Sequence, residues 1–262
     1  MRFGLLIIAS FLIFISFKPA EVAELTVDYV VKDQLSDFEV NGEVDQLIER
    51  RYSVKDTVRK LTNEFHINYN ELGQVKQYTM YRMTHYSDRS VMEKSARLNY
   101  FYEADKLVMI ESFSYRDPEV EPDSSERSYI KYTYHNAKKA SYKAYRYGNY
   151  DHNGEIKIID NQHVSERIKY PKGKSKPVSY VKEYDVNFQL IKFERNYIYE
   201  KEKKVETKIY KYQNGRLAHE ESHNLKQNYD YELDSNGNWT LRRTFLSNNN
   251  LIEELEREVI YR

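Results

Sequence analysis

From about Phe65 to the end of the chain, apolar and polar residues alternate with a period of two. Ile130, Tyr132 and Tyr134, for example, are separated by polar residues. Side chains two positions apart share one face of a β-strand, so these strands have an aromatic face and a polar face. Tyr suits such a face because its ring covers apolar neighbours while its hydroxyl still reaches water. The pattern predicts antiparallel β-structure for this part of the chain.

Three other segments are less regular. Leu25 to Val31 alternates and predicts a first strand, whereas Val44 to Lys60 fits either a short helix or irregular structure. Leu251 to Val259 fits both an amphipathic helix and a strand. We favour the strand, because a strand follows the polar turn in the other parts of the chain.

A short motif recurs along the alternating region and indicates hairpins. It consists of an aromatic or apolar residue, a polar turn that often contains Gly, and a returning apolar residue. The clearer copies are Tyr69–Val75, Tyr150–Ile156, Tyr212–Leu217 and Leu233–Trp239, and degenerate copies are Tyr102–Leu107, Tyr134–Ala140 and Tyr184–Leu190. We expect Gly73, Gly154, Gly215 and Gly237 to be structural turn residues, where positive φ favours Gly.

Two of these copies carry a family resemblance. Tyr150 to Ile156 has the Tyr-Asp and Gly of the pattern Tyr-Asp-x-x-Gly-Arg-Leu, and Tyr212 to Leu217 has its Gly-Arg-Leu. The region from Phe65 to Arg262 therefore resembles the YD repeat of the Rhs family, in the form of small exported proteins of Bacteroidetes. The resemblance implies a sheet built of hairpin repeats. In that family long arrays enclose a toxin, but this chain has too few copies for a closed shell.

The predicted fold class is all-β. We expect an antiparallel meander of stacked β-hairpin repeats with roughly a dozen strands, which forms a twisted open sheet, a half-barrel or a roll. Residues 21–64 would supply an N-terminal strand and a mixed segment, and residues 65–262 the β-hairpin repeat domain.

The first 20 residues predict export. Arg2 precedes an apolar run from Phe3 to Phe17, which is typical of a signal peptide and short for a membrane span. Cleavage after Ala20 would place Lys18 where a small residue is preferred, so an uncleaved N-terminal anchor remains the alternative. Either interpretation places the rest of the chain in the periplasm or outside the cell.

Composition narrows the chemistry. The chain has 41 basic and 41 acidic residues, so its balanced charge gives no long-range attraction to nucleic acid. It has no Cys, which excludes disulfides, a thiol nucleophile and a thiolate zinc site. Its 26 Tyr residues agree with a β-rich fold and offer rings that bind sugars or peptides.

One catalytic motif is present. His219-Glu220-Glu221-Ser222-His223 matches H-E-x-x-H, which on a helix places two His ligands on one face and lets the Glu activate a zinc-bound water. The motif begins four residues after Gly215, where the repeat predicts a returning strand. In a strand the two His side chains would lie about 13 Å apart, too far to share one metal.

Other polar clusters carry weaker indications. The acidic segment from Asp117 to Asp123 could hold calcium, but it lacks the Asp-x-Asp-x-Asp-Gly framework and fits a solvated loop. The remaining His residues are scattered, and the sequence has no Gly-rich phosphate loop.

The sequence therefore predicts an exported binding or structural module of the cell envelope, without catalysis and without a cofactor. The alternatives are a zinc metallopeptidase through His219, Glu220 and His223, and a carrier of a lipid or other apolar ligand in a curled sheet. Expected partners are a polysaccharide, a peptide or another envelope protein. Nucleic acid is not expected, and contact with a membrane would involve only the N-terminal segment.

Overall fold

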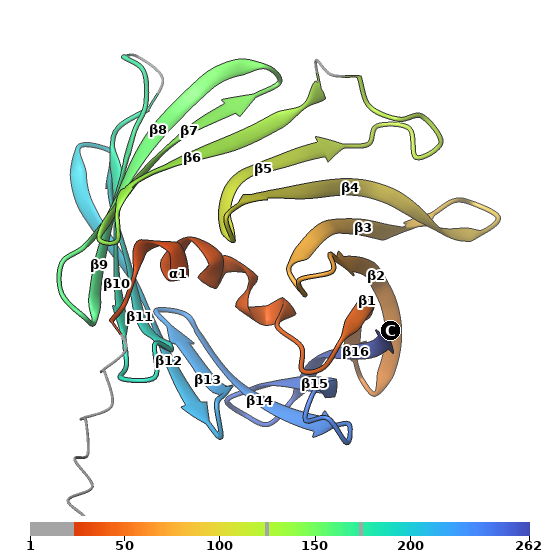
Figure 1. The fold of residues 1–262 in the computed structure, drawn as a ribbon. Helices are drawn as coiled ribbons and strands as arrows, with labels where there is room; N and C mark the ends of the chain where they lie inside the picture. Colours follow the sequence, from red (N-terminus) through yellow and green to blue (C-terminus); the bar gives the residue numbers. More distant parts are fainter. Residues whose placement is uncertain (1–23, 124–125, 173–174) are drawn as a thin grey trace, which may run out of the picture.

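The computed structural model describes residues 24–123, 126–172 and 175–262. Within these residues, sixteen antiparallel strands follow one another around a closed barrel, and the first strand pairs with the last (Figure 1). The predicted all-β meander is confirmed. The open sheet or half-barrel is wrong, because β1 pairs with β16 over Val44–Ser53 and removes both sheet edges. The predicted signal peptide, residues 1–20, lies outside the described residues.

Each strand forms antiparallel hydrogen-bonded pairs with its two neighbours in the barrel. The bounds are β1 Val44–Lys55, β2 Val58–Tyr69, β3 Val75–His85, β4 Ser90–Glu103, β5 Lys106–Ser114, β6 Ser128–Asn136, β7 Lys139–Arg146, β8 Asn149–Ile158, β9 His163–Lys169, β10 Val178–Tyr184, β11 Leu190–Tyr199, β12 Glu202–Gln213, β13 Arg216–Ser222, β14 Leu225–Leu233, β15 Trp239–Leu246 and β16 Leu251–Tyr261. The strand favoured for Leu251–Val259 is confirmed. The segment from Val44 to Lys60, predicted to be a short helix or irregular structure, instead forms β1 and the start of β2, in the same sheet as the repeats.

The described chain before β1 is helical and lies inside the barrel (Figure 1). The strand predicted over Leu25–Val31 is wrong: α1 spans Val27–Lys32 and a 3₁₀ helix spans Asp33–Phe38. The hydroxyl of Thr26 caps α1 by accepting a hydrogen bond from the Tyr29 amide. No helix among the described residues is long and apolar enough to cross a membrane.

This N-terminal segment fills one end of the barrel. Its apolar side chains are buried against inward-facing residues of many strands; the cluster includes Leu25, Val27, Val30, Val31 and Leu35 from the segment and Leu47, Ile67, Leu107, Ala140, Val164 and Tyr184 from the wall. Backbone contacts fix its position, since the Val27 amide donates to the Ala137 carbonyl at 2.8 Å. The hydroxyl of Tyr29 donates to the Phe188 carbonyl at 2.8 Å. We call this end of the barrel the closed end.

Six of the seven repeat copies lie at the closed end. They span the connections that follow β2, β4, β6, β10, β12 and β14, and in an up-and-down barrel these connections share one end. The first aromatic residue of several copies points inward beside a shift in strand register and donates its hydroxyl to a backbone carbonyl. Tyr102 donates to Val75 at 3.0 Å, Tyr134 to Leu107 at 2.9 Å, and Tyr212 to Leu190 at 3.1 Å. The motif thus couples each hairpin to an earlier one.

We expect Tyr102→Phe to lower the free energy of unfolding by about 1 kcal/mol, because it removes one half-buried hydrogen bond and keeps the ring. Tyr199→Phe is the matched control, since Tyr199 is 57% exposed and the loss of its hydroxyl should change stability by less than about 0.5 kcal/mol. Urea unfolding of both variants measures the difference. Equal midpoints would show that the carbonyl bond does not stabilise the hairpin.

The glycines of the motif have two different roles. Gly73, Gly215 and Gly237 lie in turns with φ of +74°, +77° and +80°. Gly154 is not a turn residue: it lies inside β8, opposite Tyr142 of β7, and the turn is at Tyr147-Gly148. A Cβ built on Gly154 would lie 2.1 Å from Cζ of Tyr142, so this Gly leaves room for an aromatic ring.

The outer wall of the barrel is charged. Strand parity separates the faces: Leu47 and Ile67 pair inside against the N-terminal segment, and Arg50 and Glu64 pair on the outer face. Most strands repeat this pattern, with charged outer residues that include Arg97, Lys143, Arg167, Glu194, Asp230, Arg243 and Glu256. An Arg or Lys on the lipid face of a membrane barrel costs about 2–4 kcal/mol at the bilayer midplane. This wall therefore suits contact with water.

Candidate binding site in the barrel interior

Beyond the N-terminal segment, the inner wall changes from apolar to charged and aromatic. The register places polar inward residues on β11, β12, β13, β14 and β15, among them Arg195, Glu206, Lys208, Glu220, Tyr229 and Arg242. The side chains of Arg195, Glu206 and Lys208 point inward and are nevertheless 43%, 54% and 46% exposed. Water therefore reaches the interior from the end opposite the N-terminal segment, which we call the open end.

Two groups of hydrogen bonds and ion pairs organise this wall. Arg195 forms an ion pair with Glu206 at 3.3 Å, and the hydroxyl of Tyr197 donates to the same carboxylate at 2.8 Å. Lys208 forms an ion pair with Glu220 at 2.8 Å. Side chains held in this way are pre-ordered, so a ligand that contacts them loses little of its binding energy to ordering them.

The tyrosines of the interior are hydrogen-bond donors at neutral pH. Burial, together with Glu220, raises the pKa of Tyr229, whose hydroxyl donates to Glu220 at 3.2 Å. Burial, with Glu220 and Asp33 adding to it, raises the pKa of Tyr210 to about 12. Burial and Glu166 raise the pKa of Tyr142, which donates to that carboxylate at 2.6 Å. The interior therefore offers neutral hydroxyls and fixed charges to a ligand.

The single Trp lies on this wall near the closed end. The Cζ atom of Arg257 stands 3.3 Å from the Trp239 ring centroid, and that of Arg242 stands 5.4 Å away. The Nε atom of Arg257 in turn donates to Glu49 at 3.1 Å in a buried ion pair. Trp239 therefore reports on the charged interior through its fluorescence, without background from another Trp.

The residues of the zincin motif do not converge. Arg216–Ser222 is strand β13 rather than a helix, and His223 lies in the following turn. His219 is on the outer face, where its Nδ1 lies 2.8 Å from the Asn228 side-chain oxygen. Glu220 points inward to Lys208. Across the described ranges no group of three His, Asp or Glu side chains is close enough to hold a metal, so the metallopeptidase alternative has no structural support.

The acidic segment after β5 is tied to the outer wall. Glu121 binds Lys94 at 2.9 Å and Arg97 at 2.8 Å, and it accepts a hydrogen bond from Tyr115 at 3.0 Å. These contacts lower the pKa of Glu121, with Lys94 the largest favourable cause. The Glu121 carboxylate thus holds the acidic loop against the outer wall through protein contacts. These contacts do not involve calcium.

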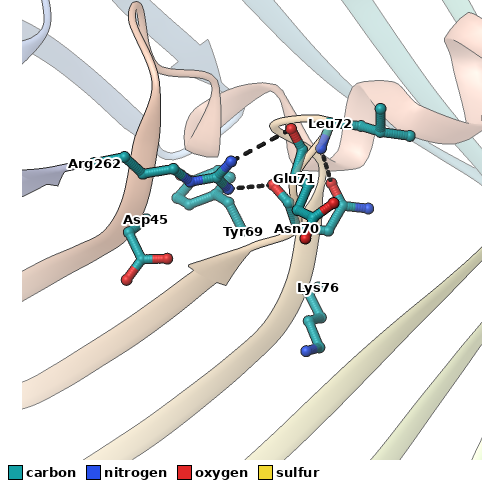
Figure 2. A pocket seen from close by; sticks show the side chains of 7 residues that line it. All are labelled: Asp45, Tyr69, Asn70, Glu71, Leu72, Lys76 and Arg262. Atoms are coloured by element: carbon teal, nitrogen blue, oxygen red, sulfur yellow. Dashed lines mark hydrogen bonds between the residues drawn. The ribbon is translucent and has the colours of Figure 1, made fainter.

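A separate hollow of about 650 Å³ lies at the closed end, next to the β2–β3 turn (Figure 2). It is lined by Asp45, Tyr69, Asn70, Glu71, Leu72, Lys76 and Arg262. Figure 2 shows the Arg262 guanidinium pointing at the turn, where it donates to the carbonyls of Asn70 and Glu71. These hydrogen bonds attach the end of β16 to the β2–β3 turn. We therefore assign Arg262 a structural role in this hollow.

Sequence reasoning did not find the interior residues. Arg195, Lys208 and Arg242 belong to mixed charge runs that are indistinguishable in sequence from a solvated outer face. The parity of the flanking aromatic residues could have located them, since Phe193 and Tyr210 share their face.

The sequence matches no known protein-family model and no curated protein. Among solved structures it is similar to a porin-like protein from Bacteroides vulgatus ATCC 8482, at 8% identity and a TM-score of 0.45 over 85% of this chain and 99% of the other. It is similar to a porin-like protein from Bacteroides uniformis ATCC 8492 at 8% identity and a TM-score of 0.41, over 84% of this chain and 99% of the other. A protein with unknown function from Bacteroides fragilis NCTC 9343 has 15% identity and a TM-score of 0.23, over 54% of this chain and 87% of the other. Similarities at these values say nothing about function.

Proposed function

We propose that this chain is an exported, non-catalytic binding protein of the cell envelope that takes up a polar ligand through the open end of its barrel. One observation carries the proposal: charged and aromatic side chains point into the barrel, are held by one another, and remain reachable by water. Export is supported by the apolar run that follows Arg2.

A carrier of an apolar ligand is less well supported. The apolar part of the interior is already filled by Leu25, Val27 and Val30, which are 1–3% exposed. The accessible part carries the ion pairs of Arg195 and Lys208. Burying an alkyl chain there would remove charged groups from water without replacing their hydration.

Accessibility of the interior is testable because the chain has no Cys. Lys208→Cys places a thiol on the inner face of β12, and Lys211→Cys places one on the outer face of the same strand. We expect N-ethylmaleimide to label both variants. A polyethylene-glycol maleimide of about 5 kDa should label only the outer thiol, because it is too large to enter the barrel. Gel shifts measure the labelling. Equal reaction of both thiols with the large reagent would contradict an enclosed interior.

Ligand uptake is tested on protein recovered from the extracellular or periplasmic fraction, by native mass spectrometry. We expect a bound small molecule in the wild-type protein and its loss in Arg195→Gln/Lys208→Gln, which removes two inward charges. Lys192→Gln/Lys211→Gln is the matched control, because it removes two outward charges from the same strands. Trp239 fluorescence titrations with the released molecule should separate the variants by about tenfold in affinity. Retention of the molecule by the inward variant would contradict the proposal.

A further inference from the structure

A row of three lysines and one asparagine crosses the outer wall of four neighbouring strands. The register pairs Lys131 of β6 with Lys143 of β7, Lys143 with Asn153 of β8, and Asn153 with Lys169 of β9. All four side chains are exposed. We call these four residues the lysine row. With strands about 4.8 Å apart, the row is roughly 15 Å long.

The charges of the lysine row lack acidic partners. Among the described residues, Lys143 and Lys169 form no ion pair, and Lys131 contacts only the Tyr129 ring, with Nζ 5.3 Å from its centroid. The nearby acid Glu155 is already shared by Lys139 and Lys157, each at 2.8 Å. Two lysines directly opposite each other across a ladder destabilise the sheet. An anion bound between Lys131 and Lys143 would remove that repulsion.

At several other positions of the outer wall, basic residues are matched with acids. Arg50 binds Glu64 at 2.8 Å, and Arg243 binds Glu232. Lys226 binds Glu221 at 2.6 Å. The chain as a whole is neutral, so the lysine row is a local excess of positive charge and not part of a generally basic surface.

We propose that the lysine row binds a linear acidic polysaccharide through its carboxylate or sulfate groups. The row runs across the strands and therefore around the convex wall of the barrel, where a flexible chain follows the curvature and a flat membrane touches few of its residues. Tyr145 lies two residues from Lys143 on the same face and contacts Tyr150, which is 42% exposed. A ring beside a row of cations suits a sugar that carries negative charge. This site is separate from the barrel interior.

Binding is tested with polygalacturonate on a biosensor surface, with neutral dextran as the uncharged comparison. We expect saturable, salt-sensitive binding to polygalacturonate only. The triple variant Lys131→Gln/Lys143→Gln/Lys169→Gln should bind about tenfold more weakly. Lys76→Gln/Lys203→Gln/Lys211→Gln is the matched control, with the same charge change at three other exposed lysines, and should stay within about twofold of the wild type. Circular dichroism verifies that both variants are folded.

Two further binding experiments test whether the ligand of the lysine row is an acidic polysaccharide. Equal loss of binding in both triple variants, with polygalacturonate or with dextran sulfate, would overturn the proposal in favour of general charge attraction. Binding to phosphatidylglycerol vesicles that depends on the lysine row, without binding to polygalacturonate, would overturn it in favour of a membrane surface. Trp239 lies on the opposite side of the sheet, so an unchanged Trp239 signal during polygalacturonate binding separates this site from the interior.

Discussion

Gly154→Ala is expected to lower the free energy of unfolding by about 2–3 kcal/mol, although Ala is ordinarily the better strand residue. The added Cβ would lie 2.1 Å from Cζ, 2.3 Å from Cε1 and 2.5 Å from the hydroxyl oxygen of Tyr142. That ring is held in place, since it is 7% exposed and its hydroxyl donates to Glu166. It therefore cannot move aside without losing packing and a hydrogen bond. Chemical unfolding measures the loss.

A double-mutant cycle tests the cause. In a Tyr142→Ala background, Gly154→Ala should be neutral or stabilise the protein by about 0.5 kcal/mol, because the obstructing ring is gone. Gly148→Ala is a control of another kind: its Cβ would meet nothing within 4 Å, but its φ of +75° should cost about 1 kcal/mol in both backgrounds. The same loss for Gly154→Ala with and without Tyr142 would show that the ring is not responsible.

The hairpin repeat was predictable where its residues act locally. At Tyr102–Leu107 and Tyr212–Leu217, an aromatic residue, a turn and an apolar residue meet within one connection, so the sequence pattern and the turn coincide. Tyr150–Ile156 has a similar sequence, but its Gly154 lies inside a strand and leaves room for the Tyr142 ring of the neighbouring strand. The real turn, Tyr147-Gly148, has φ of +51° and +75° and was not distinguished by the pattern.

The strand count was too low because several turns carry no Gly. Asp56-Thr57 and Glu200-Lys201 both adopt positive φ at two successive residues, the geometry of a tight hairpin, without the usual Asn-Gly sequence. Their conformation follows from the pairing of the flanking strands, which a reading of local residue preferences does not include.

The N-terminal helix and the closure of the barrel depend on distant contacts. Leu25, Val27 and Val31 alternate as a strand would, but Val27, Val30 and Val31 also share one face of a helix. The apolar wall that buries this face comes from strands as far away as Tyr184. The interior site has the same origin, since only the register separates inward Lys208 from outward Lys211.

Glu49→Gln is expected to lower the free energy of unfolding by about 3–5 kcal/mol, because it removes the carboxylate that pairs with a buried guanidinium. Glu49 and Arg257 are 7% and 2% exposed and lie opposite each other on β1 and β16, the two strands that close the barrel. Arg257 is held further by the Trp239 ring, 3.3 Å from its Cζ atom, and cannot turn toward water without losing that contact. Unfolding followed by Trp239 fluorescence measures both the loss and the local change.

The large loss of stability expected for Glu49→Gln depends on the burial of its ion pair with Arg257. Two variants test this explanation. Glu194→Gln removes one partner of an ion pair with Lys192 whose side chains are 28% and 36% exposed, and should change stability by less than about 1 kcal/mol. Glu49→Leu/Arg257→Met replaces the buried ion pair with apolar side chains and should recover most of the loss. If the double variant is as unstable as Glu49→Gln, the ion pair itself closes the barrel. If Glu49→Gln lowers the free energy of unfolding as little as Glu194→Gln does, water reaches the ion pair between β1 and β16. The description of this ion pair as buried inside a closed barrel would then be wrong.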